Sequence, residues 1–258
     1  MMRKRNQSVT ILIFFFSITM ISFLTKFLSE WTHEFLGHIG FGYLVGGNPV
    51  EFKVAWLWPL KFGYAIVHFE SSATNAARAV TKGGGIIMCL FMASISQLSV
   101  YYLEKTSLRN NWFGEILFHT LFWYGFWAFT NSVGYLLVGS ILSYGDIADI
   151  SYYSGISVWI FTIPGFIFFS LFYYIISINC FHLFYPFVSL QPKWLIFLFW
   201  WVIPILYILF YLNPDIIIQI PLFVGGFLIM LIPSLFSYFT IQHKWKFWTR
   251  LYPYPSLK

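Results

Sequence analysis

Charged residues are scarce in this chain of 258 residues. Only 9% of the residues are Asp, Glu, Lys or Arg, whereas 59% are hydrophobic, 24% are aromatic and the mean hydropathy is +0.73. A soluble globular domain carries about 25% charged residues, so the composition argues against an ordinary soluble domain and favours an integral membrane protein. Cysteine is also rare. Cys89 and Cys180 lie in separate apolar runs, which argues against a disulfide framework and against a cysteine-based zinc site.

The net charge of +6 does not indicate nucleic-acid binding. Basic residues that flank apolar segments anchor those segments at the membrane surface and favour the cytoplasmic side. We therefore expect membrane lipids as partners, no nucleic acid, and a multi-pass protein of the cell membrane with both termini in the cytoplasm. The residues behind this prediction are Arg3, Lys4 and Arg5 near the start and Lys244, Lys246, Arg250 and Lys258 near the end.

Long apolar segments dominate the sequence. At about 20 residues per membrane span, the pattern predicts an all-α polytopic membrane protein with about six transmembrane helices, forming a single transmembrane domain over residues 1–258. The first segment is longer than a signal-peptide core and no small-residue cleavage site follows it, so we interpret it as a retained helix. The predicted spans are 9–28, 83–103, 113–142, 155–178, 193–212 and 216–239.

Residues 46–82 differ in character from these segments. Gly46-Gly47-Asn48-Pro49 is typical of a turn. The stretches 50–58 and 62–69 are rich in Val, Ile and aromatic residues, which predicts two short strands joined around Pro59. Because an exposed strand edge is not stable in lipid, we expect this small β-hairpin to pack against the helices or to lie at the membrane interface.

Soon after the first apolar segment two histidines flank a glutamate: His33, Glu34 and His38. Ionisable groups at membrane depth are costly and mark functional sites. Histidine supplies neutral nitrogen ligands for Zn²⁺, and a glutamate beside the first ligand can act as general base for a metal-bound water. That is the chemistry of H-E-x-x-H, but here the motif reads H-E-x-x-x-H, which is one residue longer.

The additional residue changes the geometry. On an ideal α-helix His33 and His38 lie about 140° apart, so they face different directions. A π-bulge widens the turn enough to bring both imidazoles to one metal ion, and Gly37 lowers the cost of such a distortion. The alternative is a polar cluster at a helix end that binds no metal.

The predicted topology brings a carboxylate to the same membrane side. With both termini cytoplasmic, the first and third spans run parallel, so their ends emerge together. The residues after the third span include Asp146 and Asp149. Either aspartate would complete a zinc site made of two histidines and one carboxylate.

This order of features resembles the site-2-protease-like intramembrane zinc metalloproteases, especially the compact prokaryotic members without a PDZ domain. The resemblance covers about residues 9–150, and we expect 151–258 to form additional C-terminal transmembrane helices. It is carried by an apolar helix that ends in the histidine motif, a glycine pair with a hairpin, a second glycine pair, and a later helix with an asparagine and a Gly-Asp pair. These are His33-Glu34, Gly37-His38, Gly46-Gly47, Gly83-Gly84, Asn131 and Gly145-Asp146.

The resemblance implies a zinc metallopeptidase, a hydrolase acting on membrane-protein or peptide substrates. It implies that His33, His38 and Asp146 bind Zn²⁺ and that Glu34 activates a water. By the same resemblance Asn131 positions the substrate or stabilises an oxyanion, and the hairpin presents the substrate in an extended form. Asp149 stays open as the rival third ligand.

Three other functions remain open at this point. A catalytically degenerate relative would serve as a membrane scaffold or as the binding subunit of a larger membrane complex. A di-iron oxidase would use the H-x-x-x-x-H spacing of His33 and His38, but the chain lacks an H-x-x-H-H box. A transporter would explain prolines inside apolar spans, such as Pro164 and Pro204, although no internal repeat supports it. The sequence leaves the substrate and the oligomeric state open.

Overall fold

A computed structural model describes residues 7–54, 63–103, 106, 108, 112–140, 143 and 145–184. This part of the chain is mostly helical and contains a two-stranded antiparallel hairpin, as the sequence predicts. The chain divides into two compact units, Met1–Phe166 and Ile167–Lys258. The predicted metalloprotease-like core, 9–150, lies within the first unit.

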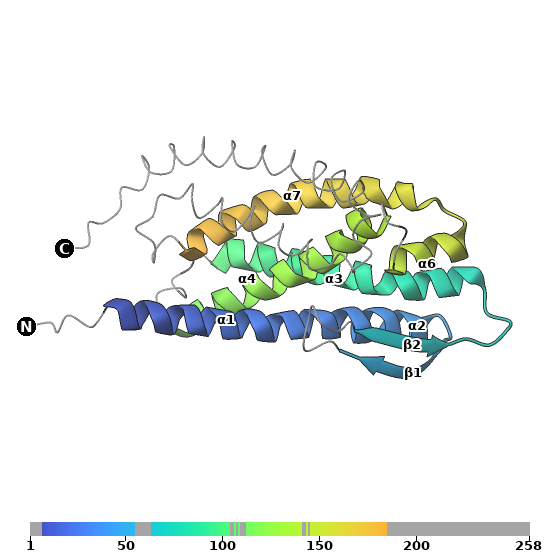
Figure 1. The fold of residues 1–258 in the computed structure, drawn as a ribbon, viewed down its shortest axis with the longest axis horizontal. Coiled ribbons are helices and arrows are strands. Elements are labelled where there is room, and N and C mark those ends of the chain that lie inside the picture. Colours follow the sequence, from blue (N-terminus) through green and yellow to red (C-terminus); the bar gives the residue numbers. More distant parts are fainter. Residues whose placement is uncertain are drawn as a thin grey trace, which may run out of the picture. The chain divides into compact units, whose positions relative to one another are not determined.

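Four of the predicted spans fall on long helices (Figure 1). The first and second lie within helix α1 (Gln7–Trp31) and helix α3 (Asn75–Leu103). The third falls on helix α4 (Trp112–Val133) and the π-helix η3 (Gly134–Gly139) that continues it. The fourth falls mostly on helix α7 (Val158–Phe184). The predicted spans 193–212 and 216–239 lie outside the described residues.

The count of six spans receives no support from the described helices. Among the residues described, one helix, Asn75–Leu103, is long and apolar enough to cross a membrane, judged by length and composition. The multi-pass architecture and the orientation of the termini therefore stay predictions.

Helix α3 has the largest share of the packing in the first unit. It packs against α4, against the π-helix η1 (Thr32–Ile39) and against helix α6 (Gly145–Ser154), while α1 packs against α4. The buried positions of α3 recur every three or four residues, which places them on one face of the helix. From Ile86 onward they are Ile86, Cys89, Ala93, Ser96, Gln97 and Val100, and Thr81, Gly84 and Gly85 are buried in the first turns.

Short elements surround η1, which continues α1 directly. Helix α2 (Gly40–Leu44) follows η1, and the hairpin of strand β1 (Asn48–Lys53) and strand β2 (Tyr64–His68) lies beside them (Figure 1). Asn48 pairs with His68 and Lys53 with Tyr64, with an irregularity between Pro49 and Glu51. Both strands contact η1. The hairpin is therefore confirmed, and the predicted turn around Pro59 lies outside the described residues.

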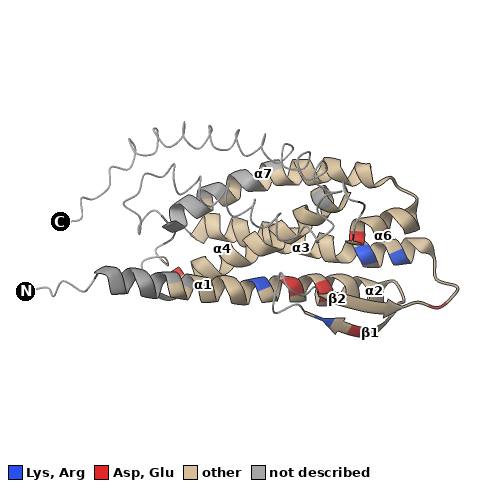
Figure 2. Cartoon of the chain, in the orientation of Figure 1, with Lys and Arg blue, Asp and Glu red and all other residues tan. Residues whose placement is uncertain are grey.

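Charged side chains are few and gather near these short elements (Figure 2). Within the described residues they lie in the second half of α1, in η1, on and after the hairpin, and near the starts of α3, α4 and α6. They are Lys26, Glu30, Glu34, Glu51, Lys53, Glu70, Arg78, Lys82, Glu115, Asp146 and Asp149. The polar chemistry of the first unit thus lies mainly around η1.

Candidate metal centre

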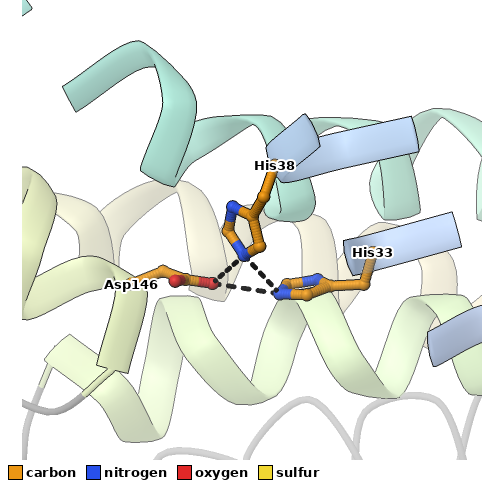
Figure 3. Close-up of side chains that lie close together, drawn as sticks. All are labelled: His33, His38 and Asp146. Atoms are coloured by element: carbon orange, nitrogen blue, oxygen red, sulfur yellow. Dashed lines mark hydrogen bonds and ion pairs between the residues drawn. The ribbon is translucent and has the colours of Figure 1, made fainter. Parts of the chain in front are cut away.

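Three side-chain atoms converge from two elements far apart in sequence (Figure 3). Nε2 of His33 lies 3.0 Å from Oδ2 of Asp146, and Nε2 of His38 lies 3.2 Å from the same oxygen. The two Nε2 atoms are 3.2 Å apart. All three residues are buried, and together they can hold a metal ion. The structure thus brings together the three ligands expected from the sequence.

The spacing of these atoms suits a small divalent transition metal. Zinc binds imidazole nitrogen and carboxylate oxygen at about 2.0–2.1 Å, so neighbouring ligands in a tetrahedral site lie about 3.3–3.4 Å apart. The observed separations of 3.0–3.2 Å require only a small adjustment. Three protein ligands leave the fourth position of a tetrahedral site open, as in catalytic zinc sites. The same donor set also suits iron(II), so metal analysis decides between the ions.

The π-helix η1 is what brings the two histidines together. A π-helical hydrogen bond joins residues five positions apart, so His33 and His38 come round to one face. Their ring centroids are 4.8 Å apart with the planes at 90°. The helical distortion that the stretched motif requires is therefore present, and it extends over Thr32–Ile39.

Glycines allow η1 to approach α3 closely. A Cβ atom on Gly37 would lie 2.4 Å from Cα of Gly85, and one on Gly84 would lie 2.5 Å from the carbonyl oxygen of Gly37. Gly85 also borders the imidazole of His33, because a Cβ there would lie 2.6 Å from ring atom Cε1. No larger residue fits this contact without movement of the backbone or of the His33 ring.

Hydrogen bonds behind the rings orient both imidazoles. Nδ1 of His38 lies 2.9 Å from the carbonyl oxygen of Thr81, which can only accept, so Nδ1 carries the proton and Nε2 keeps its lone pair. The thiol of Cys89 donates to the carbonyl of Ser29 at 3.8 Å, and its sulfur lies 3.8 Å from Nδ1 of His33. The sulfur is thus placed to accept from Nδ1–H of His33. Such contacts fix the tautomer of ligating histidines and aim the other nitrogen at the metal.

The ionisation of the cluster favours a bound cation. Burial raises the pKa of Asp146, but the adjacent His38 and the hydrogen bonds from both imidazoles outweigh it and hold this pKa well below its ordinary value. Burial lowers the pKa of His33, but hydrogen bonds with Asp146 and Cys89 outweigh that effect and raise this pKa well above its ordinary value. Without a metal, the site therefore retains an ionised carboxylate and binds a proton.

Glu34 lies beside these ligands and is buried. Its Oε2 has no hydrogen-bond partner among the described residues. Its Oε1 lies close to Gly63, the residue before strand β2, because a Cβ atom on Gly63 would lie 2.9 Å from this oxygen. Burial raises the pKa of Glu34, and the neighbouring His33 and His38 oppose this rise. A buried carboxylate oxygen without a partner is costly, which makes Glu34 a good acceptor for a water or substrate group.

Asn131 and Asp149, two other sequence candidates, lie in different surroundings. Nδ2 of Asn131 donates to Oε1 of Glu30 at 3.2 Å, and Lys26 pairs with the same oxygen. Asp149 forms an ion pair of 2.8 Å with Lys82 and is about half exposed. Asp146 rather than Asp149 therefore joins the histidines, and a catalytic role for Asn131 stays a prediction.

Sequence reasoning missed several residues that support the ligands. Tyr135 stacks on the ring of His33, with centroids 5.1 Å apart and planes at 9°. Tyr135, Thr81 and Cys89 lie in segments without a motif, and nothing in their sequence context marks them as neighbours of the site. Gly85, by contrast, belongs to the run Gly83-Gly84-Gly85, whose small residues indicate a close backbone approach from the sequence itself.

No family model, no curated protein and no solved structure matches this chain. The resemblance to site-2-protease-like enzymes therefore depends on the motif residues alone and stays a prediction.

Proposed function

We propose that this chain is an intramembrane zinc metalloendopeptidase that hydrolyses peptide bonds of membrane-embedded protein or peptide substrates. The observation that carries the proposal is the buried Glu34, whose Oε2 lacks a partner among the described residues, beside the convergent His33, His38 and Asp146. A metal site alone would not need such a carboxylate, whereas a hydrolase needs one as a base.

Each residue has a separate role in this proposal. His33, His38 and Asp146 would hold the ion through Nε2, Nε2 and Oδ2. Bound zinc supplies a Lewis acid and lowers the pKa of a coordinated water to about 7. Glu34 accepts the proton of the attacking water at its free oxygen and returns it to the leaving nitrogen, which is general base and then general acid catalysis.

The hairpin is suited to present the substrate. Strands β1 and β2 contact η1, and Gly63 at the entry to β2 lies close to Oε1 of Glu34. An extended peptide that added to the edge of this sheet would gain backbone hydrogen bonds and expose a carbonyl group. A helical transmembrane substrate would have to unwind locally, because a helix engages its own carbonyls.

Integration into a membrane is part of the same proposal. Helix α3 buries one face against the protein, while large apolar side chains on its other side are exposed, which suits contact with lipid. The exposed residues of α3 are Val80, Ile87, Phe91, Ile95, Leu98, Tyr101 and Tyr102. Several membrane spans, with both termini cytoplasmic, remain the arrangement that we propose for the whole chain.

Metal content and hydrolysis measured together test the proposal. The protein is purified in detergent, its metals are determined by mass spectrometry, and hydrolysis is followed after reconstitution with a panel of single-span model membrane proteins. We expect bound zinc and a cleaved product in the wild type. His33→Ala and Asp146→Asn should lose zinc. Glu34→Gln should keep zinc and slow hydrolysis by about 10²–10⁴-fold.

Matched controls come from the same region of the chain. Glu70→Gln changes an exposed glutamate beyond the hairpin strands, and Asp149→Asn changes the neighbouring aspartate on α6. These two variants should retain zinc and hydrolysis. A wild type without any transition metal would contradict the metal centre, and hydrolysis at the wild-type rate in Glu34→Gln would contradict the base. Bound zinc without hydrolysis in the wild type would favour the catalytically degenerate scaffold.

A further inference from the structure

The ring of Tyr135 lies against one ligand of the centre. Its plane is within 9° of the plane of His33, and the centroids are 5.1 Å apart. Gly85 borders the same imidazole, since a Cβ atom there would lie 2.6–2.9 Å from three of its ring atoms. The imidazole of His33 is therefore restricted by a parallel aromatic ring and by the backbone of α3, in addition to its contact with Cys89.

The same tyrosine ring also touches the backbone that presents the carboxylate ligand. A Cβ atom on Gly145 would lie 2.7 Å from Cε1 of Tyr135. Gly145 has a φ of +62°, a conformation that favours glycine, and it starts the helix whose next residue is Asp146. One side chain thus contacts His33 directly and, through Gly145, limits the position of Asp146.

The local backbone places Tyr135 for these two contacts. It is the second residue of the π-helix η3, Gly134–Gly139, which follows α4. Single π-helical turns occur disproportionately at functional sites because they redirect side chains. Metal coordination also draws electron density from an imidazole, so an aromatic face beside it becomes more favourable when the ion is bound.

We infer that Tyr135 is a positioning residue of the metal centre, and that its aromatic ring holds His33 and Asp146 at ligand separation. This inference rests on the proposed metal centre. It goes beyond that proposal because it assigns a role to a residue that is not itself a ligand. We assign this role to the ring of Tyr135 and not to its hydroxyl group.

Three substitutions in the full-length protein, purified in detergent, separate the ring from general packing. The affinity for Zn²⁺ is measured by competition with a chromogenic chelator, and the visible spectrum of bound Co²⁺ reports ligand geometry. Tyr135→Leu should weaken zinc binding by about 10–100-fold, as loss of a supporting residue does, and should alter the Co²⁺ spectrum. Tyr135→Phe should retain both properties. Phe122→Leu removes a buried ring of α4 that packs on Trp123 and Phe126, and it should also retain both.

The outcomes are distinct. Wild-type affinity and spectrum in Tyr135→Leu would overturn the inference while the metal centre stands. Equal losses in Phe122→Leu would assign the effect to packing, and equal losses in Tyr135→Phe would assign it to the hydroxyl group; either result overturns the role of the ring. If Tyr135→Leu does not fold, Tyr135→Met replaces it as a longer and more flexible side chain of similar volume. A wild type that binds neither Zn²⁺ nor Co²⁺ would overturn the proposed function itself.

Discussion

Nε2 of His33 and Nε2 of His38 lie 3.2 Å apart although five positions separate the two residues. In an α-helix the same residues would diverge by about 140°, and Glu34 rather than His33 would share a face with His38. The π-helix over Thr32–Ile39 reverses that relationship. H-E-x-x-x-H in a π-helix thus places its two imidazoles as H-E-x-x-H does in an α-helix.

The contact between Gly37 and Gly85 predicts that η1 tolerates no side chain at position 37. A Cβ atom there would lie 2.4 Å from Cα of Gly85, and both helices would have to move apart. We expect Gly37→Ala to lower the free energy of unfolding by about 1–3 kcal/mol, the usual cost of overpacking, and to reduce bound zinc. Gly40→Ala is the matched control, because the nearest atom to its Cβ is 3.7 Å away. Denaturant unfolding in detergent compares the two, and equal stability would contradict this prediction.

The position of Gly85 beside the ring of His33 predicts that a substitution there weakens metal binding without unfolding the protein. A Cβ atom at this position meets the end of the His33 side chain, 2.7 Å from Nε2, and an imidazole can rotate away where a backbone cannot. We therefore expect Gly85→Ala to remain folded and to bind zinc about 10–100-fold more weakly. Gly83→Ala adds the same methyl group two residues earlier, with its nearest neighbour at 3.8 Å, and should bind as the wild type does. Equal zinc affinity in the two variants would show that the His33 ring is not confined by α3.

The pKa values of the cluster predict opposite effects of pH on the metal-free and zinc-bound protein. The pKa of His33 is raised above the ordinary value of about 6.5. Its protonated form therefore stabilises the metal-free protein below that pH, and this stability is lost as pH rises through the raised pKa. Zinc must displace the same proton, so its affinity increases over the same range.

Denaturant unfolding at a series of pH values, with a chelator or with zinc, measures both effects. The metal-free protein should lose stability as pH rises above about 6.5, and the increment due to zinc should grow. His33→Ala removes the group and should flatten the first trend. Asp146, whose pKa is lowered, contributes stability that is lost only in more acidic solution. A metal-free wild type that gains stability over the first range would contradict this account.

The sequence predicted the parts of the site that depend on local chemistry. Apolar length indicated α1 and α3, turn residues indicated the hairpin, and the spacing of His33 and His38 required the π-helical distortion that is observed. Contacts between distant segments could not be predicted in the same way. The carbonyl of Thr81 lies 43 positions from His38 and has no side-chain signal. Whether Asp146 or Asp149 joins the histidines depends on the orientation of α6, and both aspartates suit the chemistry equally.

Asn131 illustrates another limit of sequence reasoning. A polar residue in an apolar helix indicates that a partner exists, but it does not identify the partner. In the structure the amide donates to Glu30, which is 101 positions away. The resemblance implies a catalytic role for Asn131, whereas this contact predicts a structural one.

The buried pair of Lys26 and Glu30 provides a prediction that distinguishes these roles of Asn131. The two side chains are 9% and 11% exposed, and Asn131 donates to the same oxygen of Glu30. Removal of one partner of a buried ion pair costs about 3–5 kcal/mol, because the remaining charge stays buried. Lys26→Met should therefore destabilise the protein by about this amount, and Lys26→Met with Glu30→Leu should restore much of the stability.

Asn131→Ala completes the series, because it removes one hydrogen bond to a charged group and should lower the free energy of unfolding by about 1.5–3 kcal/mol. In the background of Lys26→Met with Glu30→Leu, the acceptor is absent and the same substitution should have little further effect on stability. Zinc content should not change in any of these variants, because none of the three residues belongs to the His33, His38 and Asp146 cluster.

If the role of Asn131 is structural, Asn131→Ala should hydrolyse substrate at the wild-type rate when each protein is assayed at a temperature at which both are equally stable. A large fall in rate with zinc retained would instead support its predicted contact with the substrate.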